Sequence, residues 1–309
     1  MARAVNDVEL IRYARGSDDQ PKLAVKRDGE LYAVDEVDRV ADLLRLRAQE
    51  FRSLLTSADR HLLRGEQMTF LPPVDGDMEV WASGVTYEMS RDARVEESTS
   101  ADVYEAVYGA ERPELFFKSA GWRVVTDGEP IGLREDSEVN VPEPELGVFI
   151  NRWAEVVGFA VCNDVSSRSI EGANPLYLPQ AKVYAGSCAV SAAVKPAWEI
   201  PDPNALGIEV TVWREETVVW QASTSTARMH RSLAELTSFL FRGENFPDGV
   251  LLLTGTGVVP QIEFGLRAGD RVDVSIERVG QLSNVVVVGK HHFGWLESAR
   301  RAAGSRTRS

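Results

Sequence analysis

The chain has 309 residues, of which 44% are hydrophobic and 26% are charged, so it is long enough for one large domain and one small domain and has an ordinary globular composition. Its formal net charge of −13 disfavours nucleic acid and anionic membranes as partners. The N-terminus lacks the apolar segment of an export signal and no apolar run is long enough to span a membrane, so we expect a cytoplasmic protein.

The first part of the chain predicts a small α+β unit. Three short β-like runs lie within residues 8–34 and are separated by turn-forming residues. From Asp35 to Leu55, apolar residues recur at helical spacing, which predicts one amphipathic helix. The Pro-, Gly- and Asp-rich stretch from Phe70 to Asp77 interrupts both patterns. We therefore predict a cap domain of residues 1–75 and a main domain of residues 76–309.

The main domain begins with a predicted strand from Val80 to Tyr87 that runs into a loop. Residues 94–112 are typical of a polar helix, and the run from Pro113 to Lys118 follows. Asp127 to Pro130 has the composition of a turn. The stretch with the most informative chemistry comes directly after this turn.

Two glutamates in an apolar run suggest a metal site. Glu143 and Glu145 are two residues apart, so in a strand both carboxylates point to the same face. Two carboxylates in one small volume raise the pKa of one of them strongly, unless a cation lies between them. Pro142 and Pro144 cannot donate to a ladder, which predicts an edge strand or the first residues of a strand. We therefore expect the site at the rim of a sheet.

A third carboxylate and a lysine follow. The apolar run from Val156 to Cys162 predicts a buried strand that delivers Asp164 at its end. Oxygen ligands without His or Cys favour Mg²⁺, Mn²⁺ or Ca²⁺ over zinc. Lys182 lies among residues that we expect in the core. A partly desolvated lysine beside a dication loses its proton more easily, which makes Lys182 a candidate general base.

Spacing alone leaves a simpler interpretation open for each of these side chains. The glutamate pair can be the solvated face of a strand, Asp164 can be a turn residue, and the ammonium of Lys182 can extend to solvent. Cys162 and Cys188 lie in apolar surroundings and fit buried reduced thiols better than a disulfide.

The C-terminal part predicts more β structure and one helix. Ser232 and Glu235 fit a capping box for a helix that ends near Gly243. The loop from Thr254 to Pro260 contains a Gly-x-Gly that is too short for a dinucleotide fingerprint. The predicted strands cover residues 189–196, 208–213, 218–222, 251–253 and 272–276.

Three stretches resemble the metal-site signature of the fumarylacetoacetate hydrolase superfamily. They are Glu143-Pro144-Glu145-Leu146-Gly147-Val148, the run from Gly158 to Arg168, and Gln180-Ala181-Lys182. The similarity extends from residue 80 to residue 295, and the run from Glu171 to Tyr184 looks most like the branch of 2-keto-3-deoxy-D-arabinonate dehydratases. The resemblance implies an α+β protein with a small N-terminal cap and a larger, mixed β-roll domain. It also implies Mg²⁺ at Glu143, Glu145 and Asp164.

The resemblance implies further site residues. Hydrolases of the superfamily usually carry Asn-Tyr-x-x-His-x-x-Glu after the first strand, but here Ser90 and Ala93 replace the His and the Glu, so the hydrolytic dyad is missing. Glu114 is implied as a proton donor, with a structural ion pair as the alternative. Lys118 is implied as an anchor for a substrate carboxylate, with the same alternative. The implied substrate-binding residues are Ser90, Arg91, Lys118 and Thr256.

The implied activity is the dehydration of a 2-keto-3-deoxy pentonate, such as 2-keto-3-deoxy-D-arabinonate, to 2,5-dioxopentanoate through a metal-stabilised enolate. Lys182 would remove the C3 proton, with a Schiff base as its alternative use. A Mg²⁺-dependent C–C hydrolase or decarboxylase of acylpyruvates or oxaloacetate is the nearest alternative, and a metal-dependent binding protein without activity is another. Members of the superfamily commonly form homodimers or homotetramers, which we also expect here.

Overall fold

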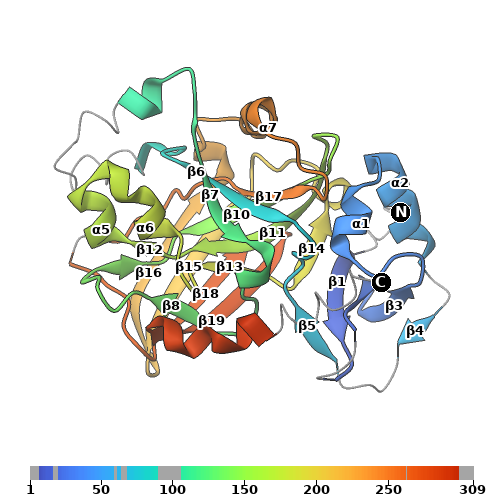
Figure 1. The fold of residues 1–309 in the computed structure, drawn as a ribbon, viewed down its shortest axis with the longest axis horizontal. Coiled ribbons are helices and arrows are strands. Elements are labelled where there is room, and N and C mark those ends of the chain that lie inside the picture. The colour runs from blue at the N-terminus through green and yellow to red at the C-terminus, as the bar shows by residue number, and fades with distance from the viewer. Residues whose placement is uncertain are drawn as a thin grey trace, which may run out of the picture.

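A computed structural model describes residues 7–16, 20–58, 61–63, 68–89, 106–261 and 263–298. Within these residues, no helix is long and apolar enough to cross a membrane. Strands and helices both contribute substantially, and the strands form two main sheets (Figure 1). The predicted α+β class is confirmed.

The largest sheet of the described residues contains twelve strands and runs through the whole molecule. β13 (Cys188–Val190) pairs with β11 and β5 (Thr69–Leu71) pairs with β1, beside the main path. The order along that path is β4 (Leu62–Leu63), β3 (Glu30–Val34), β2 (Lys22–Arg27), β1 (Val8–Ala14), β14 (Ala193–Pro196), β11 (Val156–Asp164), β10 (Pro144–Ile150), β17 (Val250–Leu253), β6 (Glu79–Gly84) and β7 (Glu114–Ala120).

A second sheet covers one face of β10 and β11. Apolar side chains of the two sheets form one core, in which Val148 and Val161 of the large sheet meet Val210 and Val274 of the second. This packing of two inner sheet faces explains the alternating pattern of the second sheet and the continuous apolar pattern of β10 and β11. The order in the second sheet is β16 (Thr217–Ser225), β15 (Gly207–Arg214), β18 (Arg271–Ile276), β19 (Gly280–Val288) and β8 (Ile131–Leu133).

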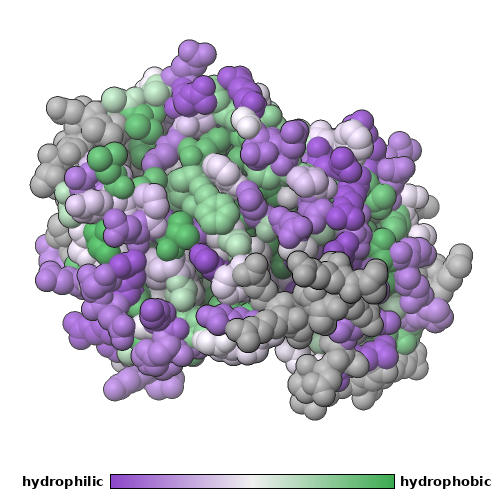
Figure 2. Space-filling view, viewed as in Figure 1, coloured by the Kyte–Doolittle hydropathy of each residue, from purple (hydrophilic) through white to green (hydrophobic). Residues whose placement is uncertain are grey.

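Two short helices cover another part of the large sheet. α1 (Val40–Leu44) and α2 (Ala48–Ser57) bury Leu43 and Phe51 in a core that also contains Phe149 of β10. Hydrophilic residues predominate on the outer side of these helices (Figure 2). The amphipathic pattern therefore predicted the buried face correctly.

The prediction of one helix from Asp35 to Leu55 was wrong, because the chain breaks between α1 and α2. The turn after β10 causes the break. Trp153 Nε1 donates to the carbonyl of Arg45 at 3.2 Å, and Asn151 Nδ2 donates to the carbonyl of Leu46 at 3.0 Å. These carbonyls are thus bonded outside the helix, and a new helix begins after Arg47.

The N-terminal strands are continuous with the large sheet, because Leu10 and Ile11 of β1 pair with Val194 and Ala193 of β14. The division into domains at residue 75 stays a prediction. Residues 189–196 form two short strands, β13 and β14, and not one. α7 (Leu233–Gly243) begins as predicted, with the hydroxyl of Ser232 accepting from the amide of Glu235 at 3.1 Å.

Four small elements lie next to the ends of β10 and β11. β9 (Asn140–Val141) pairs with β12 (Ser166–Ser167) in a separate two-stranded sheet. The helices α5 (Arg168–Ala173) and α6 (Leu178–Lys182) follow β12 and contact each other. These helices bring their side chains to the place where β10 begins and β11 ends.

Candidate metal centre

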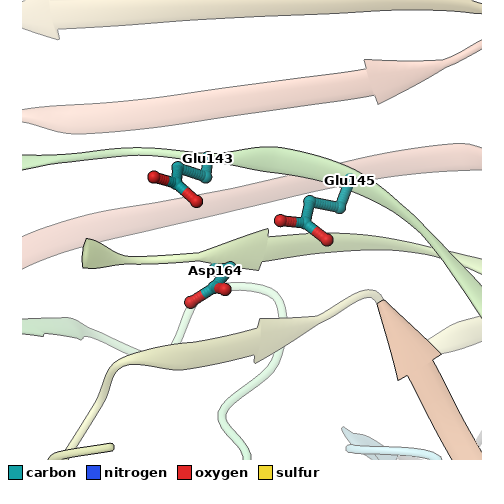
Figure 3. A group of neighbouring side chains, drawn as sticks. All are labelled: Glu143, Glu145 and Asp164. Carbon is teal, nitrogen blue, oxygen red and sulfur yellow. The ribbon is translucent and has the colours of Figure 1, made fainter. Parts of the chain in front are cut away.

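The register between β10 and β11 brings the three predicted carboxylates together. The amide of Asp164 donates to the carbonyl of Glu143 at 2.9 Å, and Glu145 pairs with Cys162 across the ladder. Glu143 and Glu145 point to the same side, toward Asp164 (Figure 3). One carboxylate oxygen from each lies within 4.8 Å of the others, and all three side chains are buried.

The position within the sheet differs from the expected edge. β10 lies between β11 and β17, in the interior of the large sheet. The prolines predicted either an edge strand or the first residues of a strand. The second alternative is correct, because Pro144 is the first residue of β10. The site is therefore at the ends of two central strands and not on an edge strand.

The electrostatics of the trio fit a hard dication. Burial and the carboxylates of Asp164 and Glu143 raise the pKa of Glu145 well above its usual value, although Lys182 and the amide of Gly255 oppose this. The amide of Gly255 donates to Glu145 Oε2 at 2.6 Å. All ligand atoms in this trio are carboxylate oxygens, the type that Mg²⁺, Mn²⁺ and Ca²⁺ prefer. A dication would remove the like-charge repulsion that burial makes costly.

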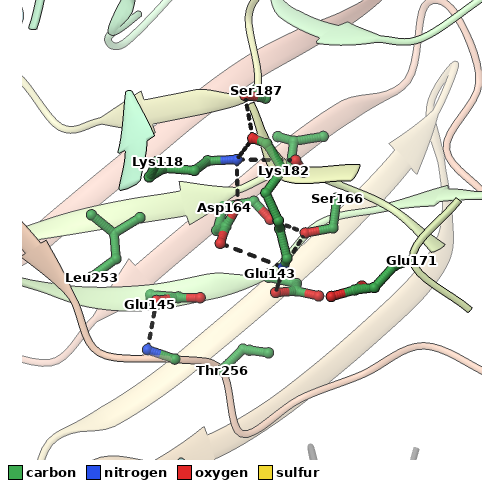
Figure 4. A network of polar contacts seen from close by, with 12 residues as sticks. Lys118, Glu143, Glu145, Asp164, Ser166, Glu171, Lys182, Ser187, Leu253 and Thr256 are labelled. Atoms are coloured by element: carbon green, nitrogen blue, oxygen red, sulfur yellow. Dashed lines mark hydrogen bonds and ion pairs between the residues drawn. The ribbon is translucent and has the colours of Figure 1, made fainter. Parts of the chain in front are cut away.

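The amine of Lys182 points into the same site (Figure 4). Its Nζ donates to Glu143 Oε2 at 2.6 Å and to Ser166 Oγ at 2.6 Å, and it lies 3.5 Å from Asp164 Oδ2. Lys182 is the last residue of α6, and its side chain is buried. The alternative in which this lysine extends to solvent is thereby excluded.

The amine of Lys118 lies behind Asp164. It forms an ion pair with Asp164 and donates to the carbonyl of Lys182 at 2.5 Å and to that of Val165 at 3.3 Å. The side chain is fully buried. This position favours the structural ion pair over an anchor for substrate.

Two other predicted residues line the pocket that contains the trio, Glu114 at the start of β7 and Thr256 in the loop after β17. Thr256 Oγ1 donates to the carbonyl of Val258 at 3.1 Å, so this hydroxyl also holds the loop together. Ser90 and Arg91 lie outside the described residues.

Sequence reasoning assigned no role to three other polar residues near the site. Ser166 holds the amine of Lys182, and Arg168 Nη1 lies 3.7 Å from Glu143 Oε1 and 3.5 Å from Glu171 Oε2. Glu171 lines the pocket from α5. All three lie close to Asp164 in the sequence. The opposite charges of Arg168 and Glu171, which are three residues apart, could have indicated an ion pair on a helix next to the site.

Comparison with known proteins agrees with this geometry. Residues 79–287 match the family described as fumarylacetoacetate (FAA) hydrolase C-terminal, which covers more than half of the chain. The chain belongs to this family. The match includes the trio, Lys182, Lys118 and Glu114, and begins at the first residue of β6.

Two proteins similar to this chain are named as dehydratases. The "Probable 2-keto-3-deoxyxylonate dehydratase" of Haloferax volcanii is 44% identical over 268 residues, which cover 84% of this chain and 89% of the relative. The 2-dehydro-3-deoxy-D-arabinonate dehydratase of Saccharolobus solfataricus is 40% identical over 237 residues, which cover 75% and 78%.

A solved structure has the same fold. It is the 2-keto-3-deoxy-D-arabinonate dehydratase complexed with magnesium and 2,5-dioxopentanoate, with a TM-score of 0.80 and 31% identity. The similarity covers 91% of this chain and 99% of that one. The fold predicted from the family resemblance is thereby confirmed.

Proposed function

We propose that this protein is a Mg²⁺-dependent dehydratase that converts a 2-keto-3-deoxy pentonate, such as 2-keto-3-deoxy-D-arabinonate, to 2,5-dioxopentanoate. The observation that carries the proposal is the meeting of Glu143, Glu145 and Asp164 with the amine of Lys182 in one buried pocket. The names of the dehydratase relatives, at 40% and 44% identity, support the same substrate class.

Glu143, Glu145 and Asp164 would hold the metal ion, in agreement with their carboxylate-only donor set. A bound Mg²⁺ supplies Lewis acidity to the keto and carboxylate oxygens of the substrate, which makes the C3 hydrogens more acidic. Lys118 keeps Asp164 oriented through their ion pair. Ser166 and Glu143 hold the amine of Lys182 in place.

The proton transfers are assigned to Lys182 and Glu114. Lys182, as the neutral amine, takes a proton from C3, and Glu114, as the protonated acid, gives a proton to the hydroxyl that leaves C4 as water. A double bond forms between C3 and C4. Tautomerisation of the resulting unsaturated C5 alcohol gives the aldehyde of 2,5-dioxopentanoate, an isomer with the same atoms. A Schiff base on Lys182 is less suitable, because a bound dication would itself supply the electron-withdrawing effect that a Schiff base provides.

Product analysis tests this function directly. The purified protein is incubated with Mg²⁺ and a panel of 2-keto-3-deoxy pentonates, acylpyruvates and oxaloacetate, and the products are identified by mass spectrometry. The expected result is the loss of one water from a pentonate, with all five carbons retained. Release of pyruvate or CO₂, with no dehydration, would instead support the hydrolase or decarboxylase alternative.

The assembly and the location of the protein are part of this proposal. We propose a cytoplasmic homodimer or homotetramer. The strand at one end of the second sheet, β16, supports an assembly because Val218 and Val219 are 40% and 36% exposed there. Light scattering in solution tests it, and a monomer at all concentrations would contradict it.

A further inference from the structure

The pocket contains more acidic side chains than a metal ion requires. Besides the trio, Glu114 and Glu171 also line it. Glu171 extends from α5, is only 3% exposed, and points toward the carboxylate of Glu143 (Figure 4). A substrate whose keto acid end lies at the metal ion therefore occupies a pocket that these additional carboxylates line.

The cations of the described residues around the trio already face acidic groups. The amine of Lys118 is paired with Asp164, and that of Lys182 with Glu143 at 2.6 Å. The guanidinium of Arg168 lies between Glu143, at 3.7 Å, and Glu171, at 3.5 Å. A second carboxylate on the substrate would thus enter a buried, acidic region. The nearby cations there already form ion pairs with carboxylates of the protein.

We propose that Glu171 is a specificity-determining residue, which favours 2-keto acids with hydroxyl groups at the far end and disfavours those with a second carboxylate there. A hydroxyl group donates a hydrogen bond to a carboxylate, whereas a carboxylate is repelled by it and loses its hydration on entering the pocket. Selection by repulsion of the wrong ligand, together with a hydrogen bond to the right one, is an effective source of specificity.

This inference rests on the proposed function, because it assumes that the keto acid end is bound at the metal ion. It deepens that function by separating the hydroxylated pentonates from dicarboxylates such as oxaloacetate. If Glu171 had no part in selecting the far end of the substrate, its loss would change stability but would leave the ratio of the two affinities unchanged. The ratio is therefore the informative measurement.

The test uses two five-carbon ligands that differ only at the far end and do not undergo dehydration. These are 5-hydroxy-2-oxopentanoate and 2-oxoglutarate, and their binding to the Mg²⁺-loaded full chain is measured by calorimetry. The wild type is expected to bind the hydroxy acid at least about tenfold more tightly. In Glu171→Gln that preference should fall by about tenfold or more, while the affinity for Mg²⁺ alone changes less than about twofold.

Glu216→Gln is the matched control, because Glu216 is exposed in the turn between β15 and β16 and its loss should leave the preference unchanged. A ratio in Glu171→Gln equal to that of the wild type would overturn the inference, as would a wild type that prefers 2-oxoglutarate or does not bind the hydroxy acid. If Glu171→Gln does not fold, Glu171→Asp replaces it. This variant should still bind the hydroxy acid more tightly than 2-oxoglutarate, but by a smaller factor than the wild type. A ratio of affinities equal to that of the wild type would count against the inference.

Failure of the proposed function would look different. A wild type that dehydrates none of the pentonates, but whose ligand preference still depends on Glu171, would contradict only the proposed reaction. Dehydration of a pentonate with a preference that is independent of Glu171 would contradict only the role of this residue.

Discussion

At the scale of single residues, the site is a set of buried charges that compensate one another. Lys118 and Lys182 both contact Asp164, and Lys182 also contacts Glu143. Such a buried network is stable only if every member has its partners, so the loss of one charge affects the others. Two variants measure this dependence.

Replacing Lys118 by Met should lower the stability of the protein by about 3 to 5 kcal/mol, because Asp164 then loses a buried cationic partner. Mg²⁺ should restore part of the loss by binding to the same carboxylate. If Lys118 orients Asp164, kcat should fall while KM changes less than about threefold. A tenfold or larger increase in KM with normal kcat would instead indicate the predicted anchor for a substrate carboxylate. Thermal unfolding measures the change in stability, and steady-state kinetics measure kcat and KM.

The raised pKa of Glu145 predicts a pH dependence of metal binding. A group whose pKa is raised by folding contributes stability below its unfolded pKa, and this contribution is lost as the pH rises through the folded value. The metal-free protein should therefore lose stability as the pH rises through the raised pKa of Glu145, and Mg²⁺ should bind more tightly above that pKa than below it, with release of a proton below it. Calorimetry in buffers of different ionisation enthalpy measures this proton. In Glu145→Gln the proton release should be absent, and its persistence there would contradict the assignment.

At the scale of elements, the loop after β17 connects the sheet to the site. Gly255 has φ +86° and donates its amide to Glu145. A Cβ at this position would overlap Thr86 Oγ1 and lie 2.9 Å from the carbonyl of Ser83. The loop can approach the end of β6 this closely only with glycine.

Gly255→Ala should therefore weaken Mg²⁺ binding by about 10- to 100-fold, because it displaces the amide that holds Glu145. Gly269→Ala is the control, since Gly269 has nearly the same φ of +85° but no atom within 4 Å of an added Cβ. It should cost about 1 kcal/mol of stability through backbone strain and leave metal binding intact. Equal effects of the two variants on metal binding, measured by calorimetry, would contradict the role of this loop.

Asp75 connects the segment before β6 to the N-terminal helices. Its carboxylate accepts from the amides of Val40 and Ala41 at 3.0 and 2.9 Å, and it pairs with Arg12 at 3.1 Å. Asp75→Ala removes the acceptor for the first amides of α1 and also the anionic partner of the largely buried Arg12 guanidinium. It should therefore lower the free energy of unfolding by about 3 kcal/mol. The exposed Asp38→Ala should cost less than about 0.5 kcal/mol. Denaturant unfolding measures both, and equal costs would show that Asp75 has no special role.

At the scale of the whole molecule, local patterns predicted much of the fold. The predicted strands that begin at Val8, Val80 and Val156 correspond to β1, β6 and β11. Patterns could not predict that β1 pairs with β14, because pairing between distant segments leaves no periodic signal. The break between α1 and α2 depends on side chains more than 100 positions away in the sequence, in the turn that contains Asn151 and Trp153.

Local patterns also predicted part of the candidate site, whereas the remainder depends on tertiary packing. The two-residue periodicity of a strand places Glu143 and Glu145 on one face, and the end of an apolar run places Asp164. The buried position of Lys118 and the turn of α5 that carries Glu171 toward the pocket depend on tertiary packing, which the sequence alone did not reveal. The family resemblance supplied the link between Lys182 and the trio, and the structure gives its geometry.

The central claim is that the metal trio and the amine of Lys182 together remove a proton from the carbon next to a keto group. The most direct test is hydrogen exchange at C3 of 2-oxobutyrate in D₂O with Mg²⁺, followed by NMR. We predict rapid exchange with the wild type and, at Mg²⁺ concentrations that saturate both proteins, a rate at least about 100-fold lower with Lys182→Met. Exchange at the wild-type rate in Lys182→Met, or exchange that continues after removal of the metal, would contradict the account.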